Sequence, residues 1–81
     1  MKRIPIFLDV HPVAGRTKAD FERIQKGPRD KFGVIHLNLF YNISEDRWFC
    51  LHDAPSKEAV RKHHEGAGLK CDWIIQVKMT E

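Results

Sequence analysis

The stretch WFCLHD at residues 48–53 decides the fold, because its side chains alternate between two kinds. Phe49 and Leu51 are ordinary core residues, whereas Trp48, Cys50 and His52 combine a large aromatic with metal-type donors. Successive side chains of a β-strand point to opposite faces of the sheet. The stretch therefore predicts a central strand with a neighbour on both faces, helices on one and a partner or an ion on the other.

The residues just before this stretch predict a hairpin. VIHLNLFYNI at residues 34–43 alternates apolar and polar side chains, and SEDR follows as a turn. If the loop spans residues 44–46, Ile43 lies opposite Arg47 and Asn38 lies opposite His52. The apolar residues of both strands then fall on one face, which favours this register.

The remaining elements are marked by helix caps and breakers. Thr17 followed by Asp20 is typical of an N-cap with an acidic first turn, and Gly27-Pro28 must interrupt that helix. Pro55 marks the start of a second helix, with Ser56 in its first turn. The predicted order is β-α-β-β-α-β, with strands at 4–11, 34–43, 48–53 and 71–79 and helices within 17–33 and 55–68.

This order predicts an α+β fold, the ferredoxin-like plait. Its antiparallel four-stranded sheet has the strand order 4-1-3-2, and both helices cover one face. A chain of 81 residues suits one domain, at 1–81. The open face of such a sheet must be covered, and we expect a homodimer that pairs sheet against sheet.

Composition and charge exclude several classes of protein. The net charge of +3 is spread among acidic residues without a long Lys/Arg run, so nucleic-acid binding is not expected. No stretch approaches the roughly 20 apolar residues of a membrane span, and the first apolar run stops at Asp9, too early for a signal peptide. Two cysteines without an export signal indicate reduced thiols and a cytoplasmic location.

The alternation assigns the strand residues to two faces. We expect the apolar set to face the helices: Ile6, Leu8, Val10, Ile35, Leu37, Leu39, Phe49, Leu51, Trp73, Ile75 and Val77. The opposite, open face would then carry Phe7, Asp9, His11, His36, Asn38, Phe40, Trp48, Cys50, His52, Ile74 and Gln76. A face that mixes large aromatics with metal-type ligands is not a plain solvated surface.

Three strands bring histidines to one end of this face. We expect the first and third strands to run parallel, so that His11 and His52 lie near the same end, and the reversed second strand brings His36 there as a diagonal neighbour. Neutral imidazoles suit nickel, zinc, copper or iron, and a nearby carboxylate or thiolate adds negative charge. The predicted metal ligands are His11, His36, His52, Asp9 and Cys50, together with His64 of the second helix.

Each of these residues also has a structural alternative. Cys50 is more often a small buried hydrophobic residue than a ligand, and Asp9 could serve only to orient a histidine ring. Cys71 is expected to be structural. His63 falls on the inner face of its helix, where a satisfied core histidine is the default, whereas His64 lies at the border of that face.

Four segments carry a resemblance to a known family: FLDVH (7–11), KFGV (31–34), RWFCLHDAPSKEAVRKHHEGAG (47–68) and DWIIQV (72–77). They resemble the small nickel-binding proteins formerly catalogued as a domain of unknown function. The resemblance implies a ferredoxin-like homodimer with octahedral nickel sites. It implies site positions at His11, Cys50, Ala54, Pro55 and either His63 or His64. The family's first helix often carries a histidine of its own, which this chain lacks.

Three functional hypotheses follow from the sequence. The first is a small dimeric metal-binding protein without chemistry of its own, which sequesters or responds to nickel or, alternatively, zinc or another divalent ion. The second is a small dimeric α/β-barrel enzyme, in which His11, His36 or His52 acts as general acid or base on an organic substrate. The third is an interaction domain whose polar face pairs with itself.

Overall fold

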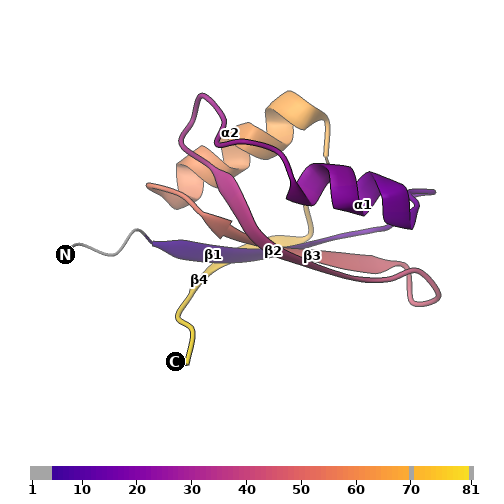
Figure 1. The fold of residues 1–81 in the computed structure, drawn as a ribbon. Helices are drawn as coiled ribbons and strands as arrows, with labels where there is room; N and C mark the ends of the chain where they lie inside the picture. The colour runs from indigo at the N-terminus through magenta and orange to yellow at the C-terminus, as the bar shows by residue number, and fades with distance from the viewer. Residues whose placement is uncertain (1–4, 70, 81) are drawn as a thin grey trace.

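Four strands and two helices form the fold in the computed structural model, which describes residues 5–69 and 71–80. In chain order they are β1 (Ile6–His11), α1 (Lys18–Gln25), β2 (Ile35–Asn42), β3 (Arg47–Asp53), α2 (Lys57–Ala67) and β4 (Trp73–Val77). Both helices lie on the same side of the sheet (Figure 1). The sheet order is β2-β3-β1-β4, and every neighbouring pair is antiparallel. The predicted ferredoxin-like plait is therefore confirmed.

The predicted direction of one strand pair is wrong. The first and third strands were expected to run parallel, but β1 and β3 are antiparallel. His11 therefore pairs with Trp48 and His52 pairs with Phe7, so the two histidines lie toward opposite ends of the strand pair. Asp9 lies between them, opposite Cys50.

The hairpin register also differs from the predicted one. The loop has one residue more than expected, because Asn42 rather than Ile43 pairs with Arg47. Asp46 ends this loop in the left-handed region (φ 55°), and its Oδ1 accepts a hydrogen bond of 3.0 Å from the backbone N–H of Val13. A β-bulge between His36 and Asn38 shifts the register again, so that His36 lies directly opposite His52.

The two faces of the sheet are reversed relative to the prediction. The set with aromatic and metal-type side chains faces the helices, and Asp9, His11, Trp48, Cys50 and His52 are all buried there. The slip by one residue and the bulge change which side chains of β2 join this layer, because a shift of one residue exchanges the faces of a strand. In this part of β2, Leu39 packs inside against the buried core, whereas Phe40 is 50 % exposed.

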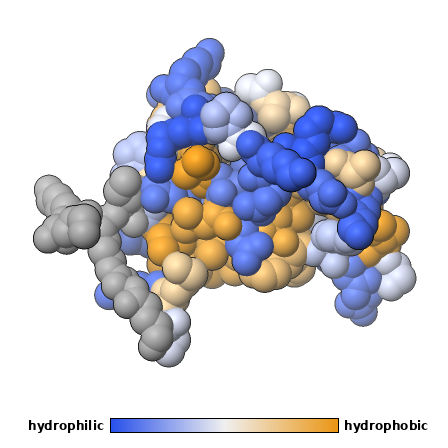
Figure 2. Space-filling model, viewed as in Figure 1, coloured by the Kyte–Doolittle hydropathy of each residue, from blue (hydrophilic) through white to orange (hydrophobic). Residues whose placement is uncertain are grey.

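The core consists of two apolar clusters on either side of the buried polar residues. The first contains Phe7, Val34, Ala54, Ala59 and Val60, and the second contains Val13, Phe21, Trp48 and Cys50. The opposite face carries rows of apolar side chains across the strands, among them Phe40, Phe49, Val10 and Trp73. Figure 2 shows hydrophobic residues gathered along the sheet, below the hydrophilic surface of the helices.

Local signals set the ends of both helices. Thr17 is the predicted N-cap of α1 and forms a capping box with Asp20, and the helix ends at Gln25, before Gly27-Pro28. Ser56 is the N-cap of α2 rather than a residue of its first turn, since its Oγ accepts from the backbone N–H of Ala59 at 3.1 Å. Within residues 5–69 and 71–80, neither helix is long and apolar enough to span a membrane.

Candidate metal centre

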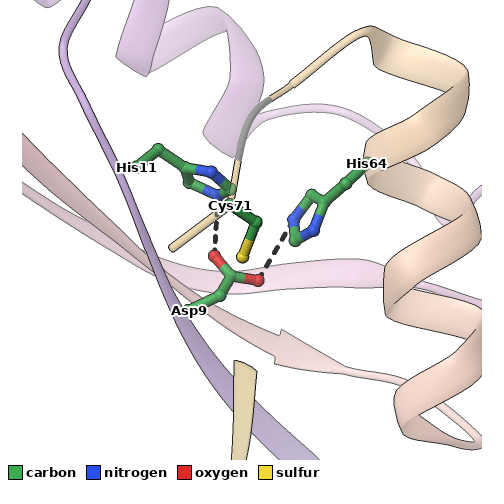
Figure 3. Close-up of side chains that lie close together, drawn as sticks. All are labelled: Asp9, His11, His64 and Cys71. Atoms are coloured by element: carbon green, nitrogen blue, oxygen red, sulfur yellow. Dashed lines mark ion pairs between the residues drawn. The ribbon is translucent and has the colours of Figure 1, made fainter. Parts of the chain in front are cut away.

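A buried carboxylate, that of Asp9, lies at the centre of the candidate site. Its Oδ1 lies 2.8 Å from His11 Nε2, and its Oδ2 lies 2.7 Å from His52 Nε2 and 3.1 Å from His64 Nε2. All four side chains are almost completely shielded from solvent. Figure 3 shows Asp9 between His11 of its own strand and His64 of α2, with Cys71 beside them. Three imidazoles from three elements therefore converge on one carboxylate.

The sequence places each of these side chains by simple periodicity. Asp9 and His11 are two residues apart on β1, so both point to the helix-facing side of the sheet. His52 lies on the same side of β3, diagonal to Asp9. His64 follows Val60 by one helical turn, and both are buried residues of α2. The helix thus brings a donor down onto the sheet from above.

The two adjacent histidines of α2 have different environments. His64 is 3 % exposed and contacts Asp9, whereas the side chain of His63 is 19 % exposed. His63 Nδ1 lies 2.5 Å from Oδ2 of Asp30, in the connection between α1 and β2. The expectation that His63 is the core histidine and His64 the border residue is therefore wrong.

The protonation states suit metal coordination. Burial raises the pKa of Asp9, but contacts with His11, His52 and His64 outweigh it, so the pKa is lowered and the group stays a carboxylate. Burial lowers the pKa of His64 and, with help from the charges of His52 and His63, lowers that of His36 to about 3. A metal ligand must be a carboxylate or a neutral imidazole, and these groups already have those forms.

The short contacts within this cluster are poorly aligned for hydrogen bonding. Among the described residues, neither ring nitrogen of His52 or of His64 has a hydrogen-bond partner of good geometry, although all are buried. The same holds for Oδ2 of Asp9. Buried polar atoms are nearly always satisfied, so an unaligned set of donors and acceptors indicates a site for another ligand.

The spacing of these donor atoms fits an ion of the nickel or zinc type. With about 2.1 Å between metal and nitrogen, two donors at right angles around one ion lie about 3.0 Å apart. The contacts of 2.7, 2.8 and 3.1 Å between Asp9 and the three imidazoles lie close to that separation. Nitrogen and carboxylate donors suit borderline divalent ions. The residues present therefore fit such an ion.

The two cysteines lie beside this cluster. Cys71 Sγ falls within 4.8 Å of donor atoms of Asp9, His11 and His64. A second group, of three residues within the same distance of one another, consists of His36, Cys50 and His52. Burial and the neighbouring Asp9 raise the pKa of Cys50, and burial raises that of Cys71. Both thus favour the neutral thiol, a poorer ligand than the thiolate.

Two cavities reach the cluster from different sides of α2. One of about 380 Å³ lies between α2 and β4, and its lining includes His64 and Cys71. Another of about 330 Å³ lies between α1 and α2, and its lining includes His36 and His63. Phe40 lies on the face of the sheet opposite to Phe7 and Trp48, so these three side chains do not line one cavity within the chain.

The structure brings together every residue that the sequence singled out, on the face of the sheet opposite to the expected one. The donor atoms of Asp9, His11 and His64 lie together with that of Cys71, and those of His36, Cys50 and His52 form a second group. The contact of 2.7 Å between His52 Nε2 and Asp9 Oδ2 joins the two groups. Cys71 was expected to be structural, and Asp30 was not singled out, whereas His63 was one of the two histidines that the resemblance left open. Cys71 lies two residues before β4, and Asp30 gives no local signal, since its partner lies 33 positions away.

Comparisons with known proteins give one match. A family model described as "Nickel responsive protein SCO4226-like" matches residues 7–77, nearly the whole chain. No curated protein and no solved structure matches.

Proposed function

The chain belongs to this nickel-responsive family, and we propose that it binds a divalent transition-metal ion, with nickel as the first candidate and zinc as the alternative. Asp9, His11, His52 and His64 would hold the ion. The observation that carries the proposal is the buried Asp9 carboxylate with three imidazole nitrogens within 3.1 Å. A bound ion would add a positive charge beside this carboxylate.

We further propose that the protein sequesters the ion or responds to it. The four side chains are buried, so donor exchange with water is restricted. His36 and Cys50 lie next to His52 and would support the site, His36 as a further imidazole and Cys50 by packing. The position of α2 could respond to the metal, because His64 belongs to α2 and the other three donors belong to strands of the sheet. Metal binding would thus fix the helix on the sheet.

A homodimer remains part of the proposal, now with an apolar interface. The open face of the sheet exposes Phe40, Trp73 and Ile75 by 41–50 %, and their pairing partners continue the apolar rows across the strands. Exposed patches of this kind mark interaction surfaces. A second copy, related by a twofold axis, would cover the patch with an equivalent one. The cytoplasmic location stays a prediction from the sequence.

Metal analysis of protein purified without a histidine tag tests the proposal. We expect bound nickel or zinc after purification, or saturable binding by calorimetry at a single class of tight sites in chelator-stripped protein. Thermal unfolding should move to higher temperature when nickel is added, because a ligand that binds only the folded state stabilises it. Protein that carries no metal, shows no binding heat and has no thermal shift with nickel, zinc or cobalt would refute the proposal.

A further inference from the structure

All five histidines of the sequence belong to one continuous series of ring contacts. The ring centroids lie 4.7 Å apart for His11–His64, 5.5 Å for His52–His64, 4.6 Å for His36–His52, 5.5 Å for His36–His63 and 5.7 Å for His52–His63. Two imidazoles on one ion have centroids about 4.6 Å apart at right angles and about 6.5 Å apart on opposite sides. Every step in the series falls within that interval.

The series runs from the surface to the buried carboxylate. His11, His52 and His64 are almost fully buried, whereas His36 and His63 are partly exposed. His36 and His63 also line the cavity of about 330 Å³ between α1 and α2. An ion that enters through this cavity therefore meets these two rings before it meets the Asp9 cluster.

Asp30 fixes the orientation of His63. Its Oδ1 accepts hydrogen bonds from the backbone N–H groups of Phe32 and Val34, at 2.9 and 3.0 Å. Its Oδ2 lies 2.5 Å from His63 Nδ1. Nδ1 therefore carries the ring proton and donates a hydrogen bond to the carboxylate. The lone pair of His63 is then on Nε2. A carboxylate that holds the far nitrogen of an imidazole is the common second partner of metal-binding histidines.

We propose that His36 and His63 form an outer, transient metal-binding site through which the Asp9 cluster is loaded and unloaded. His63 would take up the ion from the cavity together with His36, and both would pass it to His52, which contacts each of them. Asp30 is the positioning residue of this uptake site. The inference rests on the proposed function, since it gives the inner metal centre a route to solvent.

The other cavity is less suited to uptake. Its lining includes Lys57, and its thiol, that of Cys71, donates to the carbonyl of Trp73 at 3.1 Å. Arg61 of the same lining pairs with Glu58 at 2.6 Å. The cavity on the His36–His63 side also carries two guanidinium groups, but both have partners. Arg23 pairs with Asp20 at 2.6 Å, and Arg16 lies over the ring of Trp48. Asp30 adds a carboxylate directly behind His63.

The substitution Asp30→Asn tests the positioning role without a change of size. The oxygen of the new amide would stay with the two backbone donors, so its NH₂ group would face His63 Nδ1. His63 would then have to accept at Nδ1 and carry its proton on Nε2, which blocks coordination there. The ¹⁵N chemical shifts of the His63 ring report this exchange of tautomers directly. Unchanged shifts in the variant would overturn the role of Asp30.

Stopped-flow quenching of tryptophan fluorescence by nickel tests the route itself. In D30N and H63L, the association and dissociation rates should both fall about tenfold, the lower end of what loss of a supporting partner causes. The equilibrium affinity should stay within about twofold, because a route changes both directions equally. E65Q is the matched control: it removes one negative charge at the other cavity and should leave both rates unchanged.

The outcomes separate this inference from the proposed function. Wild-type rates in D30N and H63L, or an equal slowing in E65Q, would overturn the uptake site while nickel binding stands. A loss of affinity in H63L without a change in association rate would make His63 a ligand of the final site and also overturn it. Wild-type protein that binds no metal would refute both. Circular dichroism of each variant establishes that it is folded.

Discussion

Replacement of Asp9 by asparagine tests the metal centre most directly. The amide has nearly the same size as the carboxylate, so no cavity forms among the buried neighbours. The change removes the negative charge that lies within 3.1 Å of three imidazole nitrogens. Loss of a partner that only supports a metal ligand costs about 10–100-fold in affinity. Loss of the central ligand should cost at least about 100-fold, the upper end of that range.

The expected thermal shift follows from this ratio. Nickel at about 100 times the wild-type Kd stabilises the folded state by about 2.7 kcal/mol. For a domain of this size, about 1 kcal/mol raises Tm by about 4–8 °C, so the wild-type shift should be about 10–20 °C. If the Kd of D9N is about 100-fold higher, the same concentration stabilises it by only about 0.4 kcal/mol, or about 2–3 °C.

The assay is thermal unfolding followed by circular dichroism, with and without nickel, on tag-free protein. D72N is the matched control, because Asp72 is exposed and its replacement removes the same charge. We expect D72N to keep the full shift. A D9N protein that is folded and still shows the wild-type shift would refute the assignment of Asp9 as the central ligand. A wild-type protein without any shift would refute the metal centre as a whole.

Three further predictions concern other parts of the molecule. If the proposed dimer forms through the open face, Trp73→Glu should convert it to a monomer in size-exclusion chromatography with light scattering; a variant that keeps a dimeric wild-type mass would contradict the interface. Thr17→Ala removes the capping box of α1 and should cost about 1 kcal/mol, measured as a fall in Tm of about 4–8 °C; an unchanged Tm would contradict it. Burial raises the pKa of the Cys50 thiol, which should resist a thiol reagent at neutral pH until the protein is unfolded. Rapid labelling of Cys50 in the folded protein, identified by mass spectrometry, would contradict its burial.

The order and arrangement of the elements could be predicted from the sequence because local signals mark each boundary. The Thr17–Asp20 capping box, the Gly27-Pro28 break and the alternation in residues 48–53 all have the same meaning in the structure as in the sequence. The direction of β1 relative to β3 was also fixed by the plait, in which all neighbours are antiparallel. The prediction that β1 and β3 run parallel was wrong because it considered these two strands without the strand order of the whole sheet.

The register of β2 could not be predicted from alternation alone. A loop longer by one residue moves Asn42 opposite Arg47, and the bulge at Leu37 changes the phase of the strand partway along its length. Both features depend on tertiary contacts, such as the bond from Val13 to Asp46. They bring His36 directly opposite His52, a closer approach than the predicted diagonal.

The error in the two faces has a physical cause that bears on function. Hydrophobicity assigned the apolar set to the helices, because burial of apolar area is the usual driving force for packing a helix on a sheet. Here the layer beneath the helices holds Asp9 and three imidazoles, and the apolar residues that would ordinarily fill it face outward. The choice of face cannot be read from alternation, since both faces have the same period.

This inversion would make the stability of the fold depend on the proposed metal ion and the proposed partner. A domain of about this size has a marginal core, and the buried carboxylate and imidazoles of the helix-facing layer add little hydrophobic stabilisation. The contacts among Asp9, His52 and His64 are poorly aligned, so an ion would stabilise the folded state more than the residues do without one. The exposed side chains of Phe40 and Trp73 would add further hydrophobic stabilisation if a second copy covered them. A metal ion on one side of the sheet and a partner on the other would therefore add the stability that the small core lacks. The concentration of nickel would then control the fraction of folded protein directly.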